Sequence, residues 1–130
     1  MAIFATRLFD KKFKSLFVTD SQLCSIAYEV MNGRFEGDLG GGVIKKRIAI
    51  NAGKSGGART IIFFKLGTHL FFADGWKKNQ VRKNAKEIPD DELEIYRDIA
   101  GDLLRLNAKQ ITQLIQAKEL REVNCDGSEY

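Results

Sequence analysis

The chain has 130 residues, 44% of them hydrophobic and 29% charged, and a net charge of +4. This length corresponds to one domain whose core needs neither disulfides nor a structural metal. A single histidine argues against a zinc site or a Ser-His-Asp triad. Arg7, Asp10 and the lysines that follow interrupt the first apolar run, so neither a signal peptide nor a membrane span is predicted. We therefore expect a cytoplasmic protein without a cofactor or a metal.

The two cysteines, Cys24 in a helical pattern and Cys125 near the C-terminus, lack the spacing of metal ligands. In a cytoplasmic protein such residues are usually reduced. We expect two isolated thiols.

The N-terminal third should contain a short strand and two helices. Residues 2–5 are apolar and predict an edge strand. A short amphipathic helix should follow, because apolar residues recur at near-helical spacing at Leu8, Phe9, Phe13 and Phe17. Thr19 precedes Gln22 by three residues, the pattern of a capping box, and Asn32-Gly33 should end the second helix.

A glycine-rich linker, residues 34–42, leads to a strand predicted at Val43–Ile50. Side chains alternate between the two faces of a strand, so Lys45 and Arg47 should project side by side. The following loop, residues 51–57, contains glycines that permit close approach of the backbone to a ligand. It lacks the spacing and the following helix of a phosphate-binding P-loop, so a nucleotide hydrolase is rejected.

Residues 58–66 are apolar on both faces after Arg59 and predict a central strand. Gly67-Thr68 should form a hairpin turn, and residues 69–73 a third strand. Pairing of these strands would bring Arg59 near Gly75-Trp76, within reach of Lys77 or Lys78.

Pro89 and the acids after it predict the start of a helix. Asn107, with Gln110 three residues later, predicts the cap of another helix. We expect a single domain over residues 1–123 and a disordered tail over residues 124–130.

Positive charge is concentrated in one third of the chain. Residues 43–86 contain eleven basic residues and one acid, whereas residues 87–130 contain five basic residues and eleven acids. Such a field on a strand-rich scaffold favours a polyanion, most simply nucleic acid. A solvated basic face without a ligand is the alternative interpretation.

Three pieces of this basic stretch occur in a recognisable order: LGGGV-x-K-x-R, GKSGG-x-RTI, and, after the hairpin, G-aromatic-x-K-N. This order resembles the RelE/HigB-type toxins, ribosome-linked endoribonucleases of bacterial type II toxin–antitoxin modules. The resemblance implies an α+β, RelE/ParE-like fold: a small antiparallel sheet with N-terminal helices packed on one face, and C-terminal helices. The face opposite the N-terminal helices would be a concave mRNA-binding surface.

The resemblance also implies roles for individual residues. The family's strand cations match Lys45 and Arg47, its arginine after the glycine loop matches Arg59, and the lysine of its G-aromatic-x-K motif matches Lys78. Where some relatives have a tyrosine near the scissile phosphate, this chain has Trp76, which can stack on a base but cannot transfer a proton.

We therefore predict metal-independent attack of a 2′-OH on the adjacent phosphate. Arg59 would stabilise transition-state charge, and Lys78 or Lys54 would transfer the proton. His69, at the hairpin turn, is expected to be structural. The predicted RNA-binding residues are Lys45, Arg47, Trp76, Lys77, Arg82, Lys83 and Lys86.

Some alternatives stay open. Arg59 could pair with an acid of the C-terminal helices, and Trp76 could be a core residue. The protein could instead be a non-catalytic, ParE-like toxin that binds DNA gyrase, or a plain RNA-binding module. The expected partners are mRNA, the ribosome and a cognate antitoxin, a DNA-binding repressor encoded adjacently; no membrane contact is expected.

Overall fold

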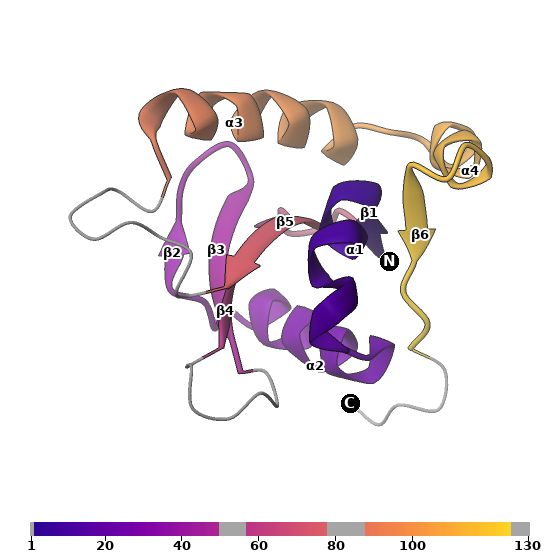
Figure 1. The fold of residues 1–130 in the computed structure, drawn as a ribbon. Coiled ribbons are helices and arrows are strands. Elements are labelled where there is room, and N and C mark those ends of the chain that lie inside the picture. Colours follow the sequence, from indigo (N-terminus) through magenta and orange to yellow (C-terminus); the bar gives the residue numbers. More distant parts are fainter. Residues whose placement is uncertain (1, 50–56, 78–87, 126–130) are drawn as a thin grey trace.

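The fold is an α+β arrangement, as expected, built on one mostly antiparallel sheet (Figure 1). A computed structural model describes residues 2–49, 57–77 and 88–125. The sheet order is β2-β3-β4-β5-β1-β6. The strands are β1 (Ile3–Thr6), β2 (Gly37–Asp38), β3 (Val43–Ile48), β4 (Ala58–Phe63), β5 (Leu70–Lys77) and β6 (Leu120–Glu122). The helices are α1 (Arg7–Phe13), the 3-10 turn η1 (Lys14–Leu16), α2 (Asp20–Met31), α3 (Asp90–Leu104) and α4 (Ala108–Gln116).

Local sequence signals place the ends of α2 and the start of α4 correctly, whereas Phe17, expected in the first helix, lies beyond η1. At the start of α2, the backbone N–H of Gln22 donates to Thr19 Oγ1 over 3.1 Å, and the backbone N–H of Thr19 donates to Gln22 Oε1 over 2.8 Å. Asn107 and Gln110 form the same reciprocal cap on α4. After α2 the chain turns at Gly33, whose φ of 83° favours glycine. In the described part of the chain, no helix is long and apolar enough to cross a membrane.

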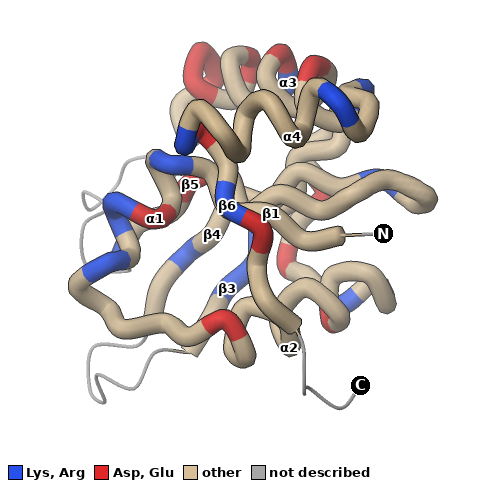
Figure 2. Tube along the Cα trace, turned by 90° about the vertical axis from the view of Figure 1, so that its right-hand side faces the viewer, with Lys and Arg blue, Asp and Glu red and all other residues tan. Residues whose placement is uncertain are grey.

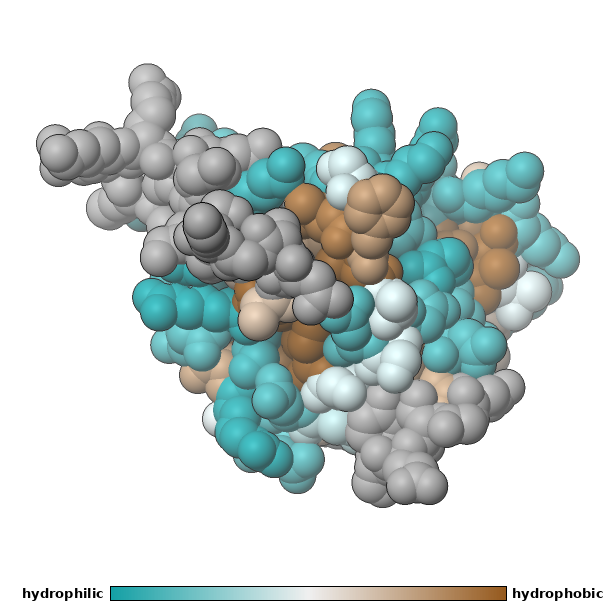
Figure 3. All heavy atoms as spheres, turned by 60° about the horizontal axis from the view of Figure 1, so that its bottom comes forward, coloured by the Kyte–Doolittle hydropathy of each residue, from teal (hydrophilic) through white to brown (hydrophobic). Residues whose placement is uncertain are grey.

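Helices cover both faces of the sheet (Figure 1). The N-terminal helices α1 and α2 pack on one face, here called the α2 face, and share a core with Ile44 and Ile62. The C-terminal helices α3 and α4 pack on the opposite face, called the α3 face, over Ile61 and Phe63. The face that the resemblance leaves open for RNA is therefore partly covered by α3. Viewed from the side of α1 and α2, the surface is mostly hydrophilic with smaller hydrophobic patches (Figure 3).

The first strand is not at the edge of the sheet, so that prediction was wrong. β1 runs parallel to β5 and antiparallel to β6, with Phe4 opposite Glu122. The backbone N–H of Val123 extends this pairing by donating to the carbonyl of Ile3 over 2.8 Å. β6 was not predicted, because three residues are too few to show a strand periodicity.

The prediction of isolated thiols was also wrong, because Cys24 and Cys125 form a disulfide with a Cα–Cα distance of 5.9 Å. Pairing of β6 with β1 carries the C-terminal segment back against α2. Arg121 on β6 binds both Asp10 and Asp20 at 2.8 Å, and it holds the same segment in place. The predicted disordered tail is thus described as far as Cys125, and its remaining residues, 126–130, lie outside the described ranges.

Candidate nucleic-acid interface

Two rows of side chains cross the sheet on the α3 face. The strand register places Arg47 on β3 opposite Arg59 on β4, and Arg59 opposite Trp76 on β5. These three residues are called the outer row. One step inward, Lys45 lies opposite Ile61, and Ile61 lies opposite Asp74; these form the inner row. The predicted alternation of β3 and the predicted proximity of Arg59 to Trp76 are both confirmed.

The cations of the two rows differ in their access to solvent. Arg47 is exposed and Lys45 is half-buried, whereas only 6% of Arg59 is exposed. The backbone N–H of Arg47 donates to the Glu36 carboxylate next to β2. Arg59 lies on β4, between β3 and β5, and is the most shielded from water of the three cations.

Trp76 lies between the core and the surface. It is half-buried, and one part of its ring packs against the core of the α3 face. Its indole N–H is buried and finds no acceptor among the described residues. The residue therefore combines the two roles considered from the sequence, a core residue and a partly accessible aromatic surface.

Two cations of the basic stretch lie on the opposite, α2 face. Lys46 is 8% exposed, and its Nζ lies 3.1 Å from Glu29 Oε1 of α2, so its charge is neutralised inside the fold. Lys77 lies opposite Ala58 in the register, on the face turned away from Arg59. β5 continues to Lys77, and the alternation of side chains along a strand explains this placement.

A buried polar cluster that was not predicted from the sequence lies beside the outer row. Asp74, 6% exposed, accepts hydrogen bonds from Lys12 Nζ at 2.7 Å, from the Tyr96 hydroxyl at 2.6 Å and from the Gly75 backbone N–H at 2.7 Å. Burial and the hydrogen bond to Asp74 raise the pKa of Tyr96 well above its ordinary value. The signal available in the sequence was that Asp74 is the one acid among eleven basic residues of positions 43–86.

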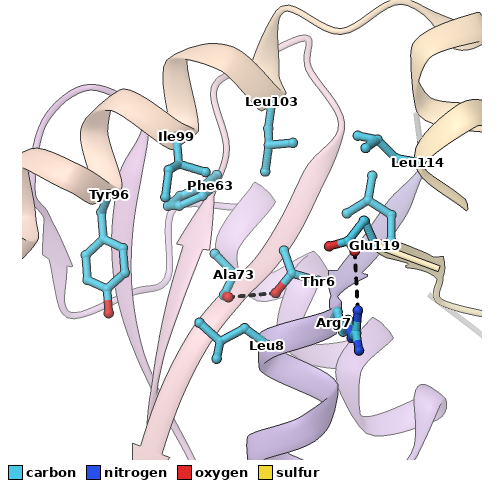
Figure 4. Close-up of a pocket in the computed structure, with 11 residues that line it drawn as sticks. Thr6, Arg7, Leu8, Phe63, Ala73, Tyr96, Ile99, Leu103, Leu114 and Glu119 are labelled. Carbon is cyan, nitrogen blue, oxygen red and sulfur yellow. Dashed lines mark hydrogen bonds and ion pairs between the residues drawn. The ribbon is translucent and has the colours of Figure 1, made fainter. Parts of the chain in front are cut away.

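An apolar cavity of about 330 Å³ opens next to this cluster, between α1, α3 and α4 (Figure 4). Phe63 and Ala73 belong to the sheet at its base, and Leu8, Ile99 and Leu103 line its sides. Tyr96 also lines the cavity, so one residue connects the apolar space to Asp74.

Of the remaining residues discussed from the sequence, His69 lies within the described ranges and five predicted site residues do not. His69 accepts a hydrogen bond from the Ala2 backbone N–H at its Nδ1 over 2.8 Å and packs edge-on against Phe4, the structural role expected for it. The other predicted site residues lie outside the described ranges: Lys54, Lys78, Arg82, Lys83 and Lys86.

A comparison with known protein families finds one that matches most of the chain. The family described as "RelE toxin of RelE / RelB toxin-antitoxin system" matches residues 1–123. No sequence among the curated proteins matches the chain. The matched range includes every strand and helix of the fold and every residue of the two rows. The chain therefore belongs to the RelE toxin family of toxin–antitoxin systems.

Proposed function

We propose that this toxin is an endoribonuclease that cleaves mRNA on the ribosome and thereby inhibits translation. The reaction would be metal-independent attack of a 2′-OH on the adjacent phosphate. The outer row carries this proposal, because it places two guanidinium groups and an indole side by side on one face of neighbouring strands. Guanidinium groups bind phosphate oxygens in pairs, and an indole stacks on an unpaired base.

The exposure of each cation suggests its role. Arg47 and Lys45 reach solvent and are suited to position the phosphates of the RNA. Arg59 is held within the sheet and shielded from water, where a fixed positive charge interacts more strongly with negative charge that develops nearby. We assign Arg59 to stabilising the transition state and Trp76 to stacking on a base.

Proton transfer is assigned to Lys78 or Lys54, as the sequence suggested. The carboxylate of Asp74 already accepts three hydrogen bonds, so it is a poor candidate for the base. Tyr96, whose pKa is raised, stays protonated at neutral pH and cannot act as a base.

Membership of the RelE family implies a cognate antitoxin. We propose that the antitoxin is a DNA-binding repressor encoded next to the toxin and that one of its acidic segments covers Lys45, Arg47 and Arg59. Opposite charges on two surfaces favour this arrangement. The site of action would be the cytoplasm, where translated mRNA is found.

Primer extension on cellular mRNA after brief induction of the toxin tests the proposal. New 5′ ends within translated messages should appear with the parental protein and be lost with Arg59→Ala. Intact mRNA during growth arrest, with DNA gyrase inhibited instead, would show that the protein is a ParE-like toxin.

A further inference from the structure

We propose that Lys12 of α1 binds an RNA phosphate beside the outer row, so that the RNA strand extends from the outer row over α1. This inference rests on the proposed function in one respect, that the ligand is RNA. It assigns a binding residue from outside the basic stretch of the sequence.

The position of Lys12 follows from its contact with Asp74. Asp74 precedes Trp76 by two residues in β5 and projects from the same face, so their Cα atoms are separated by about 7 Å. Lys12 Nζ lies 2.7 Å from Asp74 Oδ1. The Lys12 ammonium therefore lies beside Asp74, which belongs to the inner row next to the outer row.

Lys12 keeps donors available for a phosphate. Its side chain is 43% exposed, although Asp74 is buried. An ammonium has three donors, and the contact with Asp74 uses one of them. The Tyr96 hydroxyl and the Gly75 N–H also bind the Asp74 carboxylate, so Lys12 can share its charge with a phosphate without leaving Asp74 unsatisfied.

The charges on either side of the site indicate the direction of the strand. α3 begins with the exposed acids Asp90, Asp91 and Glu92, and acidic residues continue along it (Figure 2). A polyanion is repelled by such a helix end.

On the other side, α1 presents the exposed residues Lys11 and Lys12 (Figure 2). Lys77 also projects toward the side of α1. Its face of β5 is the one on which a Cβ at Gly75 would meet the Phe13 ring of α1 at 2.5 Å. Cations from two elements thus lie on the α1 side of β5, Lys12 beside Asp74 and Lys77 on the face turned away from Arg59.

The chain supplies a matched control in Lys14. It is also an exposed lysine directly after α1, but it lines a different cavity together with Asp10 and Arg121. Lys14 therefore lies on the flank of α1 opposite to Asp74. A general effect of net charge would affect both lysines equally, whereas a phosphate contact beside Asp74 would involve Lys12 alone.

The experiment measures binding of an uncleavable single-stranded 2′-O-methyl RNA to the full chain at several salt concentrations. Each phosphate contact on a single strand contributes about 0.7 to the slope of log K against log salt concentration. Lys12→Gln should reduce the slope by about this amount, and Lys12→Arg should restore it. Lys14→Gln should leave it close to parental. The Tm of each variant reports any loss of stability from breaking the contact with Asp74.

A parental slope for Lys12→Gln, even with a lowered Tm, would show that Lys12 only stabilises the fold and would overturn the inference. Equal losses for Lys12→Gln and Lys14→Gln would also overturn it. If the parental protein binds RNA with the expected effect of Lys12 but leaves cellular mRNA intact, the cleavage proposal fails while the RNA contact stands. If the parental protein does not bind this RNA, the inference about Lys12 fails, and primer extension on cellular mRNA still decides the cleavage proposal.

Discussion

Arg59 on β4 lies directly opposite Trp76 on β5, and Arg47 flanks Arg59 on its other side. Arg59 is 6% exposed and sits in the central part of the sheet, with the core of the α3 face beside it. Burying a charge in this position costs free energy unless the charge is paired with another group or takes part in binding or catalysis. Its placement makes Arg59 the first residue to test.

Replacement of Arg59 should separate cleavage from binding. Arg59→Ala should lower the single-turnover cleavage rate at saturating enzyme by about 100-fold or more, on the scale of losing one preorganised donor. RNA binding should weaken only modestly, because Lys45 and Arg47 remain. Lys65→Ala is the matched control, since Lys65 is an exposed cation beyond the other end of β4. Cleavage at the parental rate by a folded Arg59→Ala variant would move the catalytic role to Lys54 or Lys78.

The antitoxin should recognise the outer row and its neighbour Lys45. A triple variant, Lys45→Ala, Arg47→Ala and Arg59→Ala, should co-purify with the adjacently encoded partner much less efficiently at moderate salt than the parental toxin does. Lys109→Ala with Lys118→Ala, two exposed lysines on and after α4, should co-purify normally. Equal recovery of the partner by the triple variant would place its binding surface elsewhere.

Tyr96 should make stability sensitive to alkaline pH. Its pKa is raised in the folded state, so between the ordinary tyrosine value of about 10 and the folded value the unfolded chain ionises while the folded chain does not. The stabilisation from Tyr96 is complete below the ordinary value and is lost as pH rises above it.

Urea denaturation between about pH 8 and pH 11 measures this effect. Tyr96→Phe should lower the free energy of unfolding by roughly 1–3 kcal/mol at neutral pH, since Asp74 loses a donor. Above about pH 10, the free energy of unfolding of Tyr96→Phe should also fall less steeply with pH than that of the parental protein. An identical decline in both proteins would show that other groups cause it.

The disulfide should stabilise the C-terminal segment. Cys24 and Cys125 are 101 residues apart, and crosslinks that close long loops stabilise by about 2–5 kcal/mol. Reductant should lower the denaturation midpoint of the parental protein. A Cys24→Ser, Cys125→Ser variant should start from the lower midpoint and show no response to reductant. If a thiol titration of the unreduced, unfolded parental protein detected two free thiols, it would contradict the disulfide between Cys24 and Cys125.

Local features of this protein were determined by the sequence itself. The reciprocal cap of Thr19 and Gln22 involves residues one helical turn apart, and the shared face of Lys45 and Arg47 requires only the period of a strand. The proximity of Arg59 to Trp76 followed from the expected hairpin, although the register of its two strands shifts between Ile61 and Ile62. The family motifs also lie in this region.

The tertiary structure alone decided the contacts between distant segments. β6 returns to β1 after more than a hundred residues, and with it Cys125 reaches Cys24 and Arg121 reaches Asp10. No local period encodes such pairings, because they depend on how both faces of the sheet are covered. For the same reason the sequence could not show that Lys12 of α1 and Tyr96 of α3 meet at Asp74, since each side chain comes from a different layer of the fold.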